Sequence, residues 1–187
     1  MDIQIKNLSV SFPSPKGDAK VLRDADIILK SGKITAVVGE SGSGKSILGA
    51  AVMGLLESSV RISGEILFGN TDLLSLSEKE LNSVRGARIG WIAQDPVTAM
   101  DPMMKVGGQM MEGVHFYRNG KDTTADGIRQ LEEFGLSDAQ RVWDTYPFRL
   151  SGGMAQRVLT AMMTLPGPEW LIAAVSYTHL TLPTKLE

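Results

Sequence analysis

The stretch "AVVGESGSGKSILGA", Ala36 to Ala50, decides the fold. It begins within the apolar run "ITAVVG", Ile34 to Gly39, which glycines bound and which is typical of a strand buried on both faces of a parallel sheet. An apolar, helix-like sequence follows from Lys45 to about Leu56. The turn between them, Gly39 to Ser46, satisfies G-x-x-x-x-G-K-[ST] between a strand and a helix, as that motif requires. The stretch therefore predicts an α/β fold with a phosphate-binding loop.

The residue types of this loop explain its chemistry. Glycines let successive backbone N–H groups turn inward around an anion, and the following helix points its positive end at the same place. Lys45 is predicted to reach the β- and γ-phosphates, and the Ser46 hydroxyl to hold Mg²⁺. The candidate nucleotide-binding residues here are Gly39, Glu40, Ser41, Gly42, Ser43, Gly44, Lys45 and Ser46. The loop alone leaves GTPases, nucleotide kinases, recombinase-like motors and transport ATPases open.

Composition limits the class of protein. The chain has 187 residues, enough for one domain or a core with a small subdomain. Its net charge of −2 gives no electrostatic argument for nucleic-acid or acidic-membrane binding. The absence of cysteine excludes disulfides and thiolate metal sites. The longest apolar stretch, Ile47 to Leu56, is far shorter than the roughly 20 residues of a membrane-spanning helix, so we expect any membrane role to come through partners.

Periodicity along the chain predicts strands first and helices later. Strands are expected over Ile3–Phe12 and within "VLRDADIILK", "GEILFGN" and "ARIGWIAQDP", the last ended by Pro96. Ser77 with Glu80 is a capping-box pattern and predicts a helix start. From about Val106 the pattern is helical: "VGGQMMEGVHFY", "TTADGIRQLEEFG", "SDAQRVW" and "LSGGMAQRVLTAMMT".

The stretch "LSGGMAQR", Leu150 to Arg157, narrows the class. Together with the phosphate loop it resembles the signature of ATP-binding cassette ATPases. Two glycines at a helix start are poor for helix stability, but they let backbone N–H groups and a hydroxyl approach a phosphate closely. The resemblance implies that Ser151, Gly152, Gly153 and Gln156 cover the ATP held by a second subunit, in a head-to-tail dimer. The alternative is an ordinary helix cap by Ser151.

Two further segments resemble parts of the same family. "IAQDPVTAMDP" resembles its Q-loop, which implies that Gln94 contacts Mg²⁺ and the attacking water, and that Asp95–Met104 faces a transmembrane partner. "LSVSF" resembles its adenine-stacking segment, which implies that the Phe12 ring lies on the base. The position is usually tyrosine in the family, and a core-facing strand residue is the alternative for Phe12.

Within the family, residues 1–173 look like the ATPases of dipeptide, oligopeptide and nickel importers. The resemblance implies a P-loop NTPase core with an N-terminal antiparallel β subdomain and a helical subdomain at about 106–164. It implies ATP and Mg²⁺ as cofactors. The implied partners are transmembrane permease subunits, a second ATPase subunit (identical or a paralogue) and, indirectly, a solute-binding protein, with no nucleic acid. The implied location is the cytoplasmic face of the bacterial inner membrane. Ala93 and Ile47 depart from the usual pattern without removing a phosphate-contacting group.

The C-terminal residues do not continue this pattern. The family has an apolar strand that ends in Asp-Glu, the Walker B acidic pair, and "PEWLIA" resembles its beginning, so we expect a cassette incomplete at its C-terminus. No acidic residue follows until Glu187, which is not expected to replace the catalytic acid, nor His179 the family's switch histidine. Val175–Thr184 matches one reading frame of a widely used transposon-based sequencing adapter. We therefore expect 174–187 to be a non-native tail and the chain to hydrolyse ATP barely; a genuine divergent C-terminus is the alternative.

Two other functions compete with the importer ATPase. A soluble cassette ATPase of translation or DNA repair usually carries two cassettes or long coiled-coil insertions, which this chain lacks. A P-loop nucleotide kinase would not explain the presence of "LSGGMAQR".

The remaining residues are interpreted as structural or as part of a docking surface. His115 is interpreted as a structural histidine, and Trp143 and Tyr146 as packing residues of the helical insert. A set of methionines is interpreted as a flexible apolar docking surface rather than a soft-metal site: Met100, Met103, Met104, Met110 and Met111.

Overall fold

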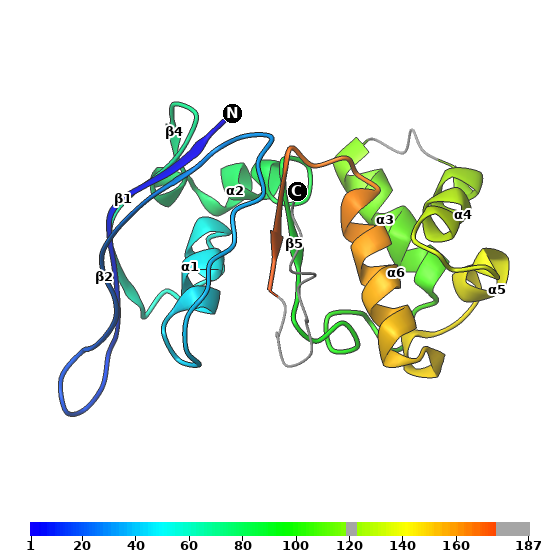
Figure 1. The fold of residues 1–187 in the computed structure, drawn as a ribbon, viewed down its shortest axis with the longest axis horizontal. Coiled ribbons are helices and arrows are strands. Elements are labelled where there is room, and N and C mark those ends of the chain that lie inside the picture. The colour runs from blue at the N-terminus through cyan, green and yellow to red at the C-terminus, as the bar shows by residue number, and fades with distance from the viewer. Residues whose placement is uncertain (119–122, 175–187) are drawn as a thin grey trace, which may run out of the picture.

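A four-stranded antiparallel sheet forms the N-terminal part of the molecule (Figure 1). The computed structural model describes residues 1–118 and 123–174. The strands are β1 (Ile3–Phe12), β2 (Ala19–Leu29), β3 (Arg61–Phe68) and β4 (Thr71–Asp72), in the order β2-β1-β3-β4. Apolar residues of β1 at alternating positions are buried, so the predicted N-terminal strand is confirmed.

Helix α1 (Lys45–Val52) packs its apolar face into the same core as this sheet. After β4 come a 3₁₀ turn, η1 (Leu73–Ser75), and α2 (Glu78–Val84). The predicted capping box is confirmed, because the Ser77 hydroxyl accepts from the Glu80 N–H and the Glu80 carboxylate accepts from the Ser77 N–H at 2.8 Å. Those two bonds satisfy backbone donors that the first turn of α2 leaves open.

Strands β5 (Ile89–Ile92) and β6 (Trp170–Ala173) pair in parallel, between the sheet and the helices (Figure 1). Ile89 belongs to the core of the antiparallel sheet, whereas Ile92 belongs to the core of the helices. Strand β5 therefore lies between two apolar cores.

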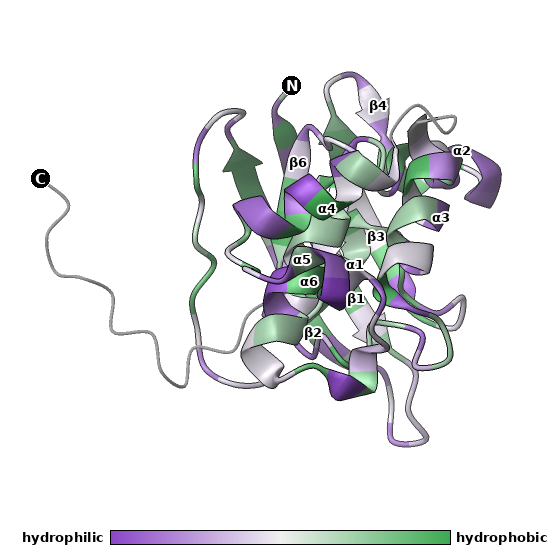
Figure 2. Cartoon of the chain, turned by 90° about the vertical axis from the view of Figure 1, so that its right-hand side faces the viewer, coloured by the Kyte–Doolittle hydropathy of each residue, from purple (hydrophilic) through white to green (hydrophobic). Residues whose placement is uncertain are grey.

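The helices after this strand form the second core: α3 (Val106–Arg118), α4 (Thr124–Glu133), α5 (Ala139–Trp143), the 3₁₀ turn η2 (Pro147–Arg149) and α6 (Gly152–Thr164). Figure 2 shows α4 with a hydrophilic and a hydrophobic side, as an amphipathic helix has. Trp143 is buried in this core, as predicted, and Tyr146 is half-buried and stacks on Phe148 with ring centroids 5.7 Å apart.

Several expectations from the sequence are wrong. His115 is exposed on α3 rather than enclosed. Of the methionines expected on a docking surface, Met100 and Met110 are buried in the helical core, whereas Met103 is 83% exposed. Periodicity shows which side of a helix is apolar, but it does not show which apolar residues another helix covers.

The largest difference is at Ile34–Gly39, expected to be a buried strand. In the structure it is irregular, and Ile34 and Val38 are exposed. A strand in the interior needs neighbours that accept and donate its backbone hydrogen bonds, and within residues 1–118 and 123–174 no strand pairs with this segment. The apolar run indicates a preference for burial, but the pairing it needs is absent from the described part of the chain.

Two glycines of α3 give a matched test of packing in the helical core. A Cβ on Gly107 would lie 2.2 Å from Cε2 of Trp143, whereas a Cβ on Gly113 would have nothing within 4 Å. Gly107→Ala is expected to lower the free energy of unfolding by about 1–3 kcal/mol through overpacking, and Gly113→Ala to raise it by up to about 1 kcal/mol. Urea unfolding followed by tryptophan fluorescence measures both, and equal effects would contradict the packing.

Candidate nucleotide-binding site

The predicted phosphate loop forms a tight turn at the start of α1. Gly42 and Gly44 have φ values of 81° and 92°, which strain residues with a Cβ. A Cβ on Gly39 would lie 2.8 Å from Oγ of Ser43. The glycines at these positions therefore allow a loop that few other residues could form.

The N-terminus of α1 lacks the side-chain cap that α2, α4 and α6 have. Ser77, Thr123 and Ser151 each accept a backbone N–H at the start of α2, α4 and α6. Gly44 stands at this position in α1 and offers no side-chain acceptor, and no acidic residue lies in the first turn. The first N–H groups of α1 and the positive end of its dipole are thus suited to an anion from outside the chain.

Lys45 reaches back across the loop. Its Nζ donates to the backbone oxygens of Gly39 at 2.8 Å and Glu40 at 2.6 Å, and to Oγ of Ser43 at 3.3 Å. The ammonium therefore lies inside the loop, and the exposed Ser46 follows it directly on the helix. A cation, the uncapped first N–H groups of α1 and an exposed hydroxyl form a donor set that fits a triphosphate with Mg²⁺.

Helix α1 also contacts the parallel strands. A Cβ on Gly49 would lie 2.7 Å from the Trp91 ring of β5 and 3.4 Å from Cγ2 of Ile172 in β6. Gln94, two residues beyond β5, is exposed. The phosphate helix and the predicted water-positioning glutamine are thus attached to the same strand pair.

The loop after Gln94 is fastened at both ends. Oδ1 of Asp95 accepts the Val97 N–H at 3.1 Å, and Gln109 of α3 exchanges hydrogen bonds with the backbone of Asp101 at 2.9 and 3.0 Å. Between these anchors Val97 is 40% exposed. The loop is therefore a defined surface rather than a loose connection.

The signature residues lie at the start of α6, on the opposite side of β5 from α1 (Figure 1). Oγ of Ser151 accepts the Met154 N–H at 3.3 Å, so Ser151 does cap the helix. A Cβ on Gly152 or Gly153 would meet nothing within 4 Å. The cap explains the serine but not the two glycines, which nothing in the described chain requires. Gly152 and Gly153 are exposed and Gln156 is half-buried.

Phe12 is the last residue of β1. It is half-buried and packs against the sheet core, as its alternative interpretation expects. Gly44 lies against Val21 and Leu22 of β2, and Leu22 pairs with Val10, two residues before Phe12. The Phe12 ring therefore has a packing role in the sheet core.

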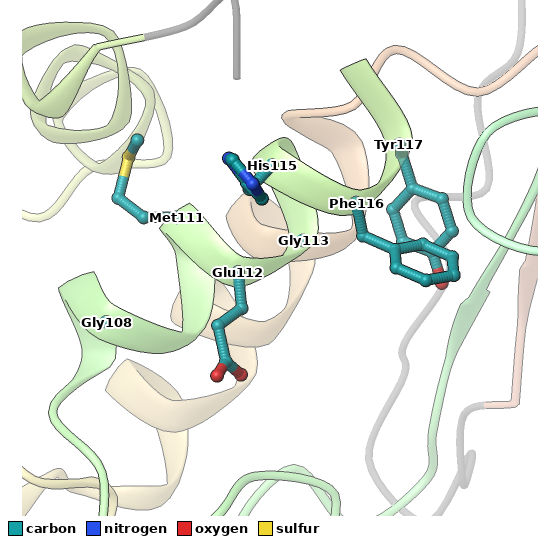
Figure 3. Close-up of a pocket in the computed structure, with 7 residues that line it drawn as sticks. All are labelled: Gly108, Met111, Glu112, Gly113, His115, Phe116 and Tyr117. Carbon is teal, nitrogen blue, oxygen red and sulfur yellow. The ribbon is translucent and has the colours of Figure 1, made fainter. Parts of the chain in front are cut away.

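The hollow on the outer face of α3 contains none of the predicted site residues. Figure 3 shows it lined by residues of one helix, among them Glu112, His115 and the exposed Phe116, whose ring meets that of Tyr117 edge-on at 5.0 Å. No group of three or more His, Cys, Asp or Glu residues in the described ranges could hold a metal ion.

Glu169, the acidic residue just before β6, forms an ion pair with Arg88. Oε1 of Glu169 accepts from Nε of Arg88 at 2.7 Å, and this hydrogen bond holds the pKa of the Glu169 carboxyl below its usual value. The carboxylate precedes β6, at the opposite end of the strand from the expected Asp-Glu pair. His179 and Glu187 lie outside the described residues.

The order of phosphate loop, Gln94 and signature within one mixed fold agrees with comparison to known proteins. A family model described as ABC transporter matches residues 22–173. The chain belongs to the ABC transporter family. All of the predicted site residues except Phe12 lie within the match.

Curated members of the ABC transporter family resemble the chain over nearly its whole length. It is 38% identical to the "Oligopeptide transport ATP-binding protein OppD" of Escherichia coli K12, with 99% of this chain and 56% of that protein covered. It is 40% identical to the "Dipeptide transport ATP-binding protein DppD" of Haemophilus influenzae, with 99% and 57% covered. The chain thus spans somewhat over half the length of these relatives.

A solved ABC cassette confirms the fold. The dimeric, post-hydrolysis structure of the ATP-binding cassette MJ0796 bound to ADP and Pi superposes with a TM-score of 0.81 at 23% identity, covering 91% of this chain and 72% of that one. The predicted fold class, a P-loop core with an antiparallel β part and inserted helices, is therefore correct. No helix among the described residues is long and apolar enough to cross a bilayer.

One residue that sequence reasoning did not single out contacts α1. Arg85, after α2, donates to backbone oxygens at the C-terminal end of α1. No spacing in the sequence connects Arg85 with the phosphate loop.

Proposed function

We propose that this chain is the ATP-binding subunit of a bacterial importer of peptides or nickel. The observation that carries the proposal is the pair of glycine-bearing helix starts: α1 without a side-chain cap, and α6 with two exposed glycines whose added Cβ atoms would meet nothing within 4 Å. Family membership and the similarity to proteins named for oligopeptide and dipeptide transport support it.

In this proposal two copies, or this chain and a paralogue, bind two ATP molecules between them. Residues Gly39–Ser46 of one subunit hold the phosphates, with Mg²⁺ on Ser46 and Gln94, while Ser151, Gly152, Gly153 and Gln156 of the other cover the γ-phosphate. Phe12 stacks on adenine. Backbone donors and an ammonium around the γ-phosphate supply electrostatic stabilisation, and closing and reopening of the pair drives the transport cycle.

The remaining surfaces are assigned to partners. The Asp95–Met104 loop contacts a transmembrane permease, which holds the subunit at the cytoplasmic face of the inner membrane and receives solute from a solute-binding protein; no nucleic acid takes part. Residues 1–173 form the nucleotide-binding domain, with a helical subdomain at about 106–164. Residues 174–187 are a non-native tail: the family match ends at residue 173, although alignments to relatives cover 99% of the chain.

Nucleotide binding tests the proposal first. Lys45→Ala removes a charged donor from the phosphates, and loss of such a hydrogen bond raises the Kd for MgATP by about 10- to 100-fold. Lys33→Ala, an exposed lysine before the loop, is the matched control. Isothermal titration calorimetry measures both, and wild-type affinity for MgATP in K45A would contradict the assignment.

The molecule that co-purifies with the chain distinguishes the importer ATPase from the competing functions. Co-purification with an integral membrane permease supports the importer, whereas co-purification with ribosomes or DNA indicates a soluble cassette ATPase. Phosphate transfer to a small-molecule acceptor would indicate a nucleotide kinase.

A further inference from the structure

Helix α1 ends in a tight backbone turn. Gly54 has a φ of 60°, its N–H donates to the Ala51 oxygen at 3.0 Å, and the Leu55 N–H donates to the Ala50 oxygen at 2.9 Å. This is the Schellman pattern, which satisfies the carbonyls of the last helical turn. The carbonyl oxygens of Met53 and Gly54 lie beyond it and need other donors.

Arg85 supplies both donors. Its Nε donates to the Met53 oxygen at 2.8 Å and its Nη2 to the Gly54 oxygen at 2.5 Å. A cation at the C-terminal end of a helix also interacts favourably with the helix dipole. The planar fork of arginine can bridge two carbonyls in this way, whereas a lysine ammonium is a single point of charge.

The guanidinium is itself held in place. The Arg85 side chain is 15% exposed, pairs with Glu78 and donates from Nη1 to Oδ1 of Asn82 at 3.3 Å. Both partners are on α2. Arg85 therefore links α2 rigidly to the end of α1 opposite the phosphate loop.

We propose that Arg85 is a positioning residue of the phosphate site. Helix α1 has 8 residues, so about 12 Å separate its two ends. Because a helix this short moves as one body, fixing its C-terminal end fixes the direction of the N–H groups at Lys45 and Ser46. The inference rests on the proposed nucleotide function, and Arg85 acts through α1 without touching the nucleotide.

The experiment compares Arg85→Met with Arg88→Met in the 187-residue chain. Arg88 is also partly buried, pairs with Glu169 and lies 4.2 Å from the centroid of the Phe68 ring, but its hydrogen bonds do not go to α1. R85M is expected to raise the Kd for MgADP about 10-fold, because the N–H groups at the start of α1 would no longer be held in advance in the binding direction. In R88M the Kd for MgADP should stay within about 2-fold of the wild-type value, even where its Tm falls as much as that of R85M. Mutations at distant sites act independently of one another, and the hydrogen bonds of Arg88 do not go to α1. Arg85→Lys, which keeps the charge, should fall between the two.

Two readouts separate positioning from general stability. In R85M the ³¹P resonances of bound MgADP should shift and the α1 amides should exchange faster with solvent, while both stay at wild-type values in R88M. Unchanged binding and resonances in R85M, or equal losses in the two variants at equal Tm, would overturn the role of Arg85 alone. If the wild-type chain binds no MgADP, both the proposed function and this inference are overturned.

Discussion

The 187-residue chain is expected to bind MgATP but to hydrolyse it far below 1 s⁻¹, the lower end of ordinary enzyme turnover. Lys45, Ser46, Gln94 and the signature are present, but no acidic residue follows Glu169 until Glu187. Glu169 is already paired with Arg88. Without a carboxylate that orients the attacking water, we expect the rate to be lower by about 10²- to 10⁴-fold, the typical contribution of a positioned base.

Phosphate release in a coupled assay measures this turnover, with Lys45→Ala as the blank for contaminating ATPases. The Kd for MgATP, measured on the same preparation, shows that the site is occupied. A turnover of about 1 s⁻¹ or more that disappears in K45A would contradict the prediction. Such a result would mean that a group within this chain replaces the missing acidic pair.

The sequence predicted most elements whose signal is local. The capping box at Ser77 and Glu80 and the helix after Ser151 were predicted correctly because caps and periodicity act within a few residues. "ITAVVG" was predicted wrongly because a buried parallel strand depends on neighbours far away in the sequence. Its exposure leaves an apolar segment on the surface, which favours aggregation of the isolated chain.

The candidate site likewise contains residues that the local sequence could predict and residues that it could not. The phosphate loop could be predicted because its glycines, lysine and serine are consecutive and their chemistry depends on that order. His115 was misjudged because apolar neighbours in the sequence need not be buried: Phe116, next to it on α3, is itself 66% exposed and lines the same hollow. Arg85 could not be predicted, since its contact with Met53 spans 32 positions and depends on how α2 packs against α1.

A bulky residue at Gly152 is expected to abolish MgATP-dependent pairing while the chain stays folded. A Cβ at Gly152 would meet nothing within 4 Å, and Ser151 would still cap α6. Gly152→Trp should therefore keep the wild-type circular dichroism and the wild-type Kd for MgATP. At the proposed interface, however, the ring would occupy the place of the γ-phosphate, and the dissociation constant of the pair should rise about 100-fold or more, as expected when a central contact is lost.

Slow hydrolysis makes this pairing measurable, because the ATP-bound pair is not consumed during sedimentation or energy-transfer experiments. Gly113→Trp is the control, since that glycine is equally open but lies on α3, outside the proposed interface.

Mixing the K45A and G152W variants decides whether the two motifs act between subunits. K45A lacks a working phosphate loop and G152W lacks a working signature, so neither should pair alone. Together they can form one complete site, from the loop of G152W and the signature of K45A. Energy transfer between differently labelled copies should appear only in the mixture, at one ATP per pair. Pairing of G152W alone at wild-type affinity would contradict the assignment of the signature to a second subunit's ATP, because the γ-phosphate could then not lie against this helix start.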